Sequence, residues 1–359
     1  MKIYQVAFSI SPGDGISNCI RAIDRVLKEK GYETQILTSF FDPRVENLRE
    51  DYSLSLIKED DVVLYHIASY SKIADDFAKM KCKRAIMYHN ITPPEFLKGY
   101  SALDAFRTSR GLSQLRPLSK NCDLAIAVSE FNRQDLLSYG FNPDTTVTCP
   151  YITDLASHDL PPDEGILNQY KGKKGANIMF AGRVVSHKRF EDVIKTFYYY
   201  KNFVDKDARL FLCGGLSSPK YYAQLAGLIH ELQLPDVIFT NHIKFQELLA
   251  YYRLADVFVC MSEHEGFCVP LLEAMYFDVP IVAYSAAAIP ETLGGAGILL
   301  KEKDFIAASE AIRKLQEDGE FRQGIIDAQR KRLNELSMDK TIDAFLKVFI
   351  PFIQGEKRA

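Results

Sequence analysis

Two glutamates at the end of a predicted strand form the densest group of chemically useful side chains in this sequence. Glu265 and Glu273 lie in the segment Ser262–Met275, which follows a hydrophobic run and opens a helix with Pro270 near its first position. Carboxylates are natural acceptors for paired hydroxyls, such as those of a ribose or a hexose. Backbone amides at the helix start could bind an anion or sugar hydroxyls. Taken singly, Glu265 could instead complement the helix dipole, and Glu273 could be a solvated surface residue.

A second cluster, Gly182–Phe190, also follows a predicted strand and enters a helix. Here Arg183 and Lys188 place a planar guanidinium and a compact ammonium group at one strand end, which suits a diphosphate. The alternative is a loop with two solvated cations. Near the N-terminus, the turn Gly13–Gly15 occupies the equivalent place and would let the backbone approach a ligand closely. It does not match the G-x-G-x-x-G pattern of dinucleotide sites.

The elements that position these clusters alternate between strand and helix. Strands are predicted in the first half at Ile3–Ile10, Thr34–Leu37, Asp61–His66, Arg84–His89 and Leu124–Val128. Strands are predicted in the second half at Asn177–Gly182, Arg209–Cys213, Val237–Thr240, Val257–Met261 and Pro280–Ala283. Helical patterns separate several of them. This alternation predicts an α/β protein with two Rossmann-like, doubly wound domains facing each other across a cleft, and with ligands outside the carboxyl ends of the strands.

A break in the alternation suggests the domain boundary. Residues 142–169 contain four prolines and little periodicity, which is typical of an interdomain connection. We therefore predict an N-terminal domain at 1–165 and a C-terminal domain at 166–337. Residues 338–359 are predicted to form a terminal helix, interrupted by Pro351, that either docks on the second domain or crosses back to the first.

Composition excludes several classes of protein. The chain has 359 residues, 47% hydrophobic and 25% charged, with a net charge of −3, so a generally basic nucleic-acid binder is excluded. Its seven scattered cysteines favour reduced thiols in the cytoplasm over disulfides or a zinc site. Neither a signal peptide nor an apolar run long enough for a membrane span is evident. We expect a cytoplasmic protein.

The two clusters together resemble the retaining glycosyltransferases of family 4, which have the GT-B fold. The E-x7-E signature of that family is matched by Glu265 and Glu273, and its G-R-x4-K segment by Gly182, Arg183 and Lys188. The likeness covers most of residues 175–300, whereas the first domain is similar only in plan. The resemblance implies that the N-terminal domain binds the acceptor and the C-terminal domain the nucleotide-sugar donor.

The resemblance implies a role for each matching residue. Arg183 and Lys188 would hold the donor diphosphate and neutralise the leaving nucleotide. Glu273 would bind the ribose hydroxyls, and Glu265 the hydroxyls of the donor sugar. His89 would lie against the donor sugar at the reacting face. From the residues alone, His89 could equally be a hydrogen-bonded histidine at a strand end.

Further contacts with the donor are implied along the same motifs. They are assigned to Gly15, Ile243, Gly266, Phe267, Cys268 and Val269. The family commonly has glycine where Cys268 stands, so a side chain there would narrow the pocket floor. No metal is required, because two fixed cations can stabilise the departing diphosphate. The D-x-D pattern at Asp205 and Asp207 is interpreted as a solvated turn.

These assignments predict a retaining, metal-independent glycosyltransferase. It would move a hexose from a UDP- or GDP-sugar to a saccharide or lipid-linked saccharide in cell-surface glycan biosynthesis. One alternative is a non-catalytic subunit of the same fold that binds nucleotide sugars. Another is a sugar epimerase or phosphorylase with this fold.

A basic stretch in the first half bears on the acceptor. Between residues 79 and 120 there are nine Lys or Arg residues and two acidic ones. Five apolar residues are interleaved with them: Phe96, Leu97, Tyr100, Leu103 and Phe106. Such a stretch suits an anionic membrane surface or a lipid-linked substrate, and would place the enzyme on the inner face of the membrane. The alternative is an ordinary helix with a solvated basic face.

Overall fold

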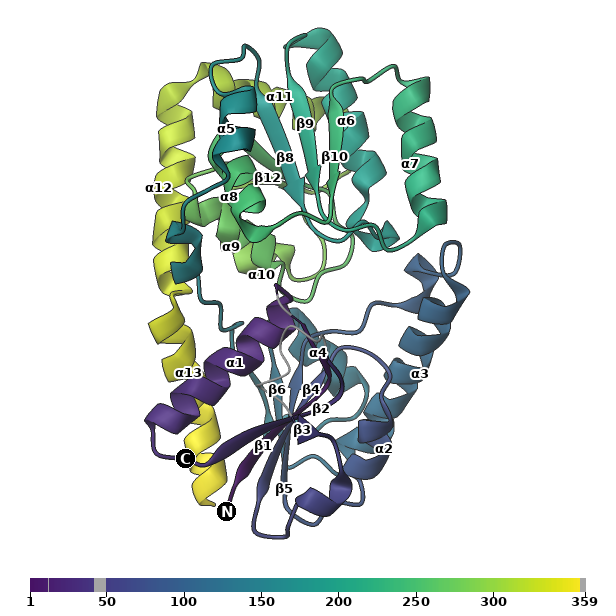
Figure 1. The fold of residues 1–359 in the computed structure, drawn as a ribbon, viewed down its shortest axis with the longest axis vertical. Coiled ribbons are helices and arrows are strands. Elements are labelled where there is room, and N and C mark those ends of the chain that lie inside the picture. The colour runs from purple at the N-terminus through teal and green to yellow at the C-terminus, as the bar shows by residue number, and fades with distance from the viewer. Residues whose placement is uncertain (12, 42–49, 356–359) are drawn as a thin grey trace. The chain divides into compact units, whose positions relative to one another are not determined.

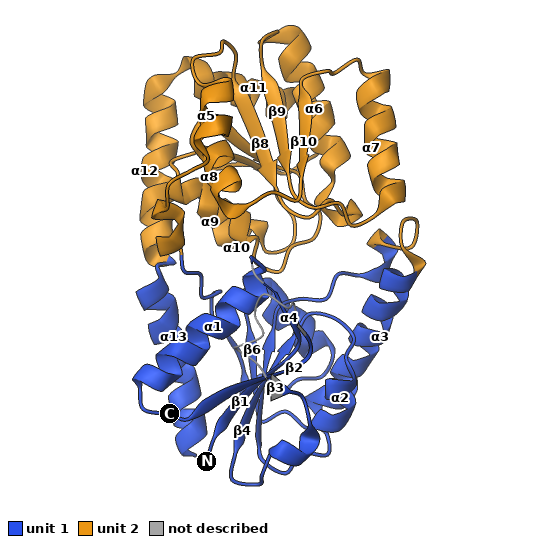
Figure 2. Cartoon of the chain, in the orientation of Figure 1, with its two compact units in different colours: residues 1–95, 103–154, 336–359 blue, residues 96–102, 155–335 orange. Residues whose placement is uncertain are grey.

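The chain forms two compact units. The computed structural model describes residues 1–11, 13–41 and 50–355 (Figure 1). Unit 1 comprises residues 1–95, 103–154 and 336–359, and unit 2 comprises residues 96–102 and 155–335 (Figure 2). The polypeptide therefore leaves unit 1 twice and returns to it twice.

Unit 1 is built on a parallel sheet whose described strands follow the order β3-β2-β1-β4-β5-β6-β7. The strands are β1 (Ile3–Ile10), β2 (Thr34–Phe41), β3 (Glu50–Asp51), β4 (Val62–Ile67), β5 (Lys83–Tyr88), β6 (Leu124–Ala127) and β7 (Thr146–Thr148). The helices are α1 (Gly15–Glu29), α2 (Lys72–Phe77), α3 (Ala102–Ser119), α4 (Glu130–Ser138) and α13 (Met338–Gln354). Every residue of β4 and β6 is buried, as expected for central strands of a parallel sheet covered on both faces.

Unit 2 repeats the same plan with the strand order β10-β9-β8-β11-β12-β13, again parallel. Its strands are β8 (Asn177–Ala181), β9 (Arg209–Cys213), β10 (Val237–Asn241), β11 (Val257–Cys260), β12 (Ile281–Tyr284) and β13 (Ile298–Leu300). Its helices are α5 (Glu164–Tyr170), α6 (Phe190–Phe203), α7 (Pro219–Glu231), α8 (Phe245–Leu254), α9 (Val269–Tyr276), α10 (Ile289–Leu293), α11 (Phe305–Glu317) and α12 (Gly319–Glu335). The predicted fold class, with two doubly wound parallel sheets, is confirmed.

Strand order reverses once in each sheet, between β1 and β4 in unit 1 and between β8 and β11 in unit 2. In open α/β sheets, ligands bind outside the carboxyl ends of the strands at such a reversal. In unit 2 these ends lead into Gly182–Lys188 and Ser262–Cys268. The two clusters singled out in the sequence therefore follow the two strands at the reversal.

Helix α13 differs from its prediction, because it continues through Pro351 to Gln354. Pro351 lies in the last turn, where a missing backbone donor removes little of the helix. Phe345, Phe349 and Ile353 recur on one face and are buried in unit 1, and this burial holds the turn in place.

The predicted connection at 142–169 also differs, since it contains strand β7 and helix α5. Both are too short to give a periodic signal, and α5 is stabilised by the Asp163 side chain, which accepts from the Ile166 amide at 2.9 Å. The boundary between the units lies between Asp154 and Leu155, before the predicted position at residue 165.

Candidate functional site

The loops that follow β8 and β11 bring Lys188 and Glu265 into contact. Lys188 ends the short 3-10 turn Ser186–Lys188, and Glu265 lies in the loop between β11 and α9. The Lys188 Nζ donates to Glu265 Oε1 at 2.6 Å, and the two side chains are only 12% and 10% exposed. The two predicted clusters are thus joined by a buried ion pair at the strand-order reversal of unit 2.

The protonation states around this pair follow from burial and charge. Burial alone would lower the pKa of Lys188, but the Glu265 carboxylate raises it above its ordinary value, so the ammonium is retained at neutral pH. Burial lowers the pKa of His264 to about 4. Burial, followed by the charge of Lys188, places the pKa of His187 well below its ordinary value. Both histidines are therefore neutral, and the positive charge of the β8 loop resides on Arg183, Lys188 and Arg189.

Two glycines allow this packing. Gly182, directly after β8, has φ +153°, and a Cβ placed there would lie 3.0 Å from Cδ and 3.3 Å from Nζ of Lys188. Gly214, after β9, has φ +154°, and its Cβ would lie 1.9 Å from the carbonyl oxygen of Gly182. Glycine at both positions therefore lets the two strand ends approach and lets the Lys188 side chain cross the backbone.

Glu273 is held by a neighbouring helix. Its Oε2 accepts from the Tyr252 hydroxyl of α8 at 2.7 Å, and its side chain is 17% exposed. Its Oε1 lies 3.6 Å from His158 Nε2, which is too long for a hydrogen bond. Tyr252 is fully buried and its ring stacks on Phe277, with centroids 5.3 Å apart. The carboxylate is thus fixed through one oxygen, and Glu273 is not the solvated surface residue of the alternative interpretation.

Cys268 occupies a backbone conformation that favours glycine. It precedes α9 with φ +70° and ψ +64°, in the left-handed region. Its thiol contacts that of Cys260 at the end of β11, and both side chains are buried. The backbone amides of Cys268 and Val269 donate to no acceptor within the described residues. The start of α9 therefore presents donors of the kind expected from the sequence.

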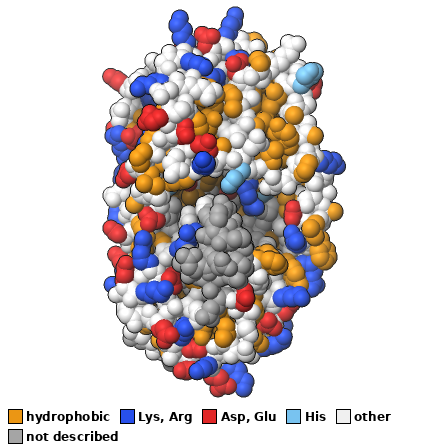
Figure 3. Space-filling model, viewed as in Figure 1, with side chains coloured by type: hydrophobic (Ala, Val, Ile, Leu, Met, Phe, Trp, Pro, Cys, Tyr) orange, Lys and Arg blue, Asp and Glu red, His pale blue; other side chains and the backbone are white. Residues whose placement is uncertain are grey.

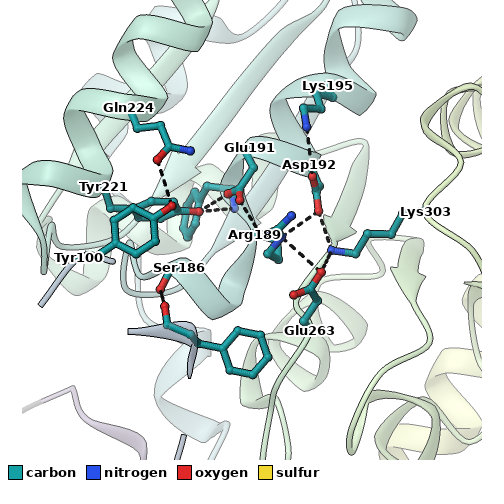
Figure 4. A network of polar contacts seen from close by, with 12 residues as sticks. Tyr100, Ser186, Arg189, Glu191, Asp192, Lys195, Tyr221, Gln224, Glu263 and Lys303 are labelled. Atoms are coloured by element: carbon teal, nitrogen blue, oxygen red, sulfur yellow. Dashed lines mark hydrogen bonds and ion pairs between the residues drawn. The ribbon is translucent and has the colours of Figure 1, made fainter. Parts of the chain in front are cut away.

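A network of ion pairs fixes both loops beside the Lys188–Glu265 pair (Figure 4). Arg189 Nε lies 3.1 Å from Asp192 Oδ2 and 3.4 Å from Glu263 Oε1. The Lys303 Nζ contacts the same two carboxylates at 2.5 and 2.6 Å. Asp192 belongs to α6 and Glu263 to the loop after β11, so the network joins the β8 and β11 loops to each other. These ion pairs restrain the backbone next to Lys188 and Glu265.

Residues 96–102 pack within unit 2, although they precede α3 in the chain. The Phe96 carbonyl accepts from the Ser186 hydroxyl, and the Phe96 ring lies 5.9 Å from that of His264. The Tyr100 hydroxyl donates to Gln224 at 3.0 Å. Of the five apolar residues interleaved in the basic stretch, Phe96, Leu97 and Tyr100 therefore belong to unit 2, whereas Leu103 and Phe106 belong to unit 1.

The two predicted site residues of the first half lie in unit 1. His89 follows β5 and is 9% exposed, and burial lowers its pKa to about 3. Its Nε2 lies 2.9 Å from Nδ1 of His66. Gly15 is the first residue of α1, where the Asp14 side chain accepts from the Ser17 amide at 3.0 Å. Asp14 thus caps the helix that the glycine turn introduces.

Three other features singled out in the sequence make no hydrogen bond or ion pair with Lys188 or Glu265 in the described part of the chain. The Arg183 side chain is exposed and makes no hydrogen bond or ion pair with any described residue. Ile243 is half-buried in the loop after β10. Asp205 accepts from the Ala176 amide at 2.7 Å and from the Asp207 amide at 3.0 Å, in a turn at the amino end of β9. The D-x-D pattern thus caps a turn away from the carboxyl ends of the strands.

No group of three or more His, Cys, Asp or Glu side chains among the described residues is arranged to hold a metal ion.

Several residues that shape the site were not identified from the sequence. Tyr252 and His158 approach Glu273 only through the tertiary fold, so no local spacing marks them. Arg189 follows Lys188 in the sequence, but no sequence pattern indicated its ion pairs. Gln5 and His66 did leave a signal, since each is a polar residue within a run of buried apolar ones.

Comparisons with known proteins agree with this geometry. Residues 167–332 match the family model "Glycosyl transferases group 1". The capsular polysaccharide biosynthesis glycosyltransferase CapM of Staphylococcus aureus is 28% identical over 160 residues, which cover 44% of this chain and 40% of CapM. A GDP-mannose-dependent phosphatidylinositol monomannoside mannosyltransferase of Mycobacterium tuberculosis is 25% identical over 230 residues, covering 60% of this chain and 57% of that enzyme. The chain therefore spans about half the length of these relatives.

Solved structures show the same fold over nearly the whole chain. Anabaena HepE, solved in complex with UDP and glucose, superposes with a TM-score of 0.75 at 16% identity and covers 98% of this chain and 99% of its own. WaaG, a glycosyltransferase involved in lipopolysaccharide biosynthesis, has a TM-score of 0.73 at 14% identity, with coverage of 97% and 99%. The fold is therefore GT-B. Residues 167–332, which contain Arg183, Lys188, Glu265 and Glu273, are similar to the group 1 glycosyltransferases.

Proposed function

We propose that this chain is a retaining glycosyltransferase that moves a hexose from a UDP- or GDP-sugar to a saccharide or lipid-linked saccharide acceptor in cell-surface glycan biosynthesis. The observation that carries the proposal is the buried Lys188–Glu265 pair at the strand-order reversal of unit 2, with Glu273 fixed on the adjoining helix. The names of the relatives support it, since they include a capsular polysaccharide enzyme, a GDP-mannose-dependent enzyme and a protein solved with UDP and glucose.

The roles of the side chains follow from their charges. Lys188 stays protonated, and together with the exposed Arg183 it would balance the negative charge that develops on the departing diphosphate. Glu265 would accept from hydroxyls of the donor sugar, and Glu273 from those of the ribose. We propose that these two cations make a divalent ion unnecessary for donor binding.

The remaining predicted contacts complete the donor site. The proposed contacts are Gly15, His89, Ile243, Gly266, Phe267, Cys268 and Val269. Among these, the amides of Cys268 and Val269 have the clearest support, because they are at a helix start and donate to no described acceptor.

Calorimetric titration with UDP, GDP, ADP and dTDP, first without and then with Mg²⁺, tests the donor site. We expect micromolar binding of one nucleotide that is indifferent to Mg²⁺ and weakened in Arg183→Ala and Glu273→Gln. Arg313→Ala is a matched control, because Arg313 is also a partly exposed cation of unit 2, and its ion pairs with described residues all lie within α11. Absence of binding to all four nucleotides would contradict the proposal.

Product analysis separates this proposal from its alternatives. With the nucleotide sugar that binds and a panel of saccharide acceptors, a retaining transferase gives a product with the anomeric configuration of the donor. Binding without turnover in the presence of acceptor would instead identify a non-catalytic subunit. Conversion of the sugar without an acceptor would identify an epimerase, and turnover dependent on inorganic phosphate a phosphorylase.

We also propose that unit 1 presents the protein, in the cytoplasm, to an anionic membrane that carries the acceptor. On α3, Leu103 and Phe106 are 58% and 60% exposed beside the exposed Arg107 and Arg110. Acidic and basic side chains are interspersed over the face seen in Figure 3, and hydrophobic and basic side chains lie side by side near α3. No helix among the described residues is long and apolar enough to span a bilayer. An apolar and basic helix face suits peripheral contact.

Sedimentation with vesicles of phosphatidylglycerol tests the membrane contact. We expect binding at low salt that weakens in the double variant Leu103→Ser/Phe106→Ser and is absent from vesicles of phosphatidylcholine. Ile306→Ser is the control, because Ile306 is similarly exposed at 58% but lies on α11 of unit 2. Equal binding by all three proteins would refute a contact through α3.

A further inference from the structure

A chain of three buried polar side chains crosses the sheet of unit 1. Gln5 lies on β1, His66 on the neighbouring β4, and His89 directly after β5. His66 Nε2 lies 3.1 Å from Gln5 Oε1, and His66 Nδ1 lies 2.9 Å from His89 Nε2. Their side chains are buried, with exposed fractions of 0% for Gln5, 4% for His66 and 9% for His89. Water therefore has little part in setting their protons.

The direction of each hydrogen bond follows from one backbone carbonyl. The Gln5 Nε2 donates to the carbonyl oxygen of Ile20 at 3.0 Å, and a carbonyl can only accept. The Gln5 amide oxygen is therefore turned toward His66, so His66 Nε2 must carry the proton. Burial lowers the pKa of His66 well below its ordinary value, and the neighbouring His89 lowers it further, so the ring is neutral and its Nδ1 is bare.

The same reasoning fixes His89. The bare His66 Nδ1 can only accept, so His89 Nε2 carries a proton and donates to it. Burial lowers the pKa of His89 to about 3, so this ring is also neutral and its Nδ1 is a bare acceptor. That Nδ1 is buried and has no hydrogen-bond partner among the described residues. An unpaired buried acceptor destabilises the protein, and a donor from a ligand would remove this cost.

We propose that Gln5 and His66 are positioning residues that hold His89 in the Nε2–H tautomer, so that Nδ1 accepts a hydrogen bond from a hydroxyl of the ligand. A bare nitrogen attracts a hydroxyl and repels a carboxylate or carbonyl oxygen at the same position. The arrangement would thus favour a neutral hexose over a uronic acid. The identification of the hydroxyl as one of a sugar rests on the proposed function, whereas the tautomer of His89 does not.

The test is nuclear magnetic resonance of the full chain labelled with ¹⁵N in its histidine rings. Among the seven histidines of the chain, the signals of His66 and His89 are assigned by their loss in His66→Asn and His89→Asn. We expect both rings to be neutral at pH 7, with the proton on Nε2. A proton on Nδ1 of His89 in the wild type would overturn the proposal without any need for a variant.

Two variants of Gln5 test the relay, by which we mean the control of the His89 tautomer by Gln5 through His66. Gln5→Glu, with its carboxyl protonated toward the Ile20 carbonyl, keeps an acceptor toward His66 and should preserve both tautomers. Gln5→Leu removes the acceptor and should give mixed tautomers of both rings. A merely structural role for Gln5 would alter the stability of the protein but leave the ring-nitrogen shifts of a folded variant unchanged, so unchanged shifts in Gln5→Leu would refute the relay.

Ligand titration then tests the acceptor role of Nδ1. We expect a UDP- or GDP-hexose to shift the His89 Nδ1 signal, and the nucleotide alone to leave it unchanged. If the nucleotide sugar binds and the signal does not move, Nδ1 does not meet a sugar hydroxyl. If no nucleotide sugar binds at all, the proposed function fails, while the tautomer measured in the free protein still decides the role of Gln5 and His66.

Discussion

Removal of one hydroxyl group should reveal how far nucleotide binding depends on the orientation of Glu273. Tyr252→Phe deletes the donor that lies 2.7 Å from Glu273 Oε2 and leaves the ring in its stack with Phe277. A hydrogen bond to a charged group contributes about 1.5–3 kcal/mol. Because the Glu273 side chain is 17% exposed, water can replace part of the bond, which favours the lower limit.

If the ribose hydroxyls require that orientation of Glu273, most of the free energy lost with the Tyr252–Glu273 hydrogen bond should appear as weaker nucleotide binding. A loss of about 1.4 kcal/mol corresponds to a tenfold rise in Kd, which calorimetry with the preferred nucleotide would measure. Tyr251→Phe is the matched control, since it removes the same hydroxyl group from the preceding residue of α8, whose ring packs on Phe211. An unchanged Kd in Tyr252→Phe, or an equal rise in Tyr251→Phe, would refute the reasoning.

Three further predictions concern the two units. In Gly182→Ala the new Cβ would crowd Lys188, and alanine is strained at φ +153°, so we expect urea unfolding to show a loss of about 1–3 kcal/mol, together with weaker nucleotide binding. Lys188→Met leaves the Glu265 carboxylate buried without its partner and should cost about 3 kcal/mol, whereas the double variant with Glu265→Gln should recover most of this loss in the same unfolding assay. His89 has a folded pKa of about 3, below its ordinary 6.5, so the unfolded state binds more protons between these values. Stability present above pH 6.5 should therefore fall as the pH is lowered, by about 2 kcal/mol at pH 5 for this residue, and wild-type unfolding free energies that do not fall from pH 7 to pH 5 would contradict it.

The sequence predicted the parts of the fold that depend on strong local signals. Strand β9, for example, has its predicted bounds of Arg209–Cys213, because a short apolar run between polar turns is unambiguous. The passage of α13 through Pro351 was not predicted, since it depends on burial of residues far along the chain. Placement of Phe96 within unit 2 likewise depends on tertiary contacts with Ser186 and His264, which local pattern does not encode.

In the candidate site, too, sequence predicted what local spacing encodes and missed what depends on tertiary contacts. The spacing of Glu265 and Glu273 marked both residues, and the order of strands explains why the β8 and β11 loops are neighbours. What spacing could not give is the partner of each carboxylate. Lys188 reaches Glu265 only because Gly182 lies beneath it, and Glu273 is held by a tyrosine from a helix that carries no motif.

These different partners give the two carboxylates different chemistry. Glu265 faces a permanent cation, so its charge is already balanced, and a diphosphate arriving at Lys188 would share that cation with it. Such sharing would place the carboxylate that we propose for the donor sugar and the leaving diphosphate on one ammonium group, which would couple donor orientation to stabilisation of the leaving group. Glu273 is held by a hydroxyl at one carboxylate oxygen, and its other oxygen accepts no hydrogen bond from a described residue. A carboxylate with one oxygen held in this way suits a pair of ribose hydroxyls. Loss of Glu273 should therefore weaken binding of the nucleotide, whereas loss of Glu265 should mainly weaken binding of the donor sugar.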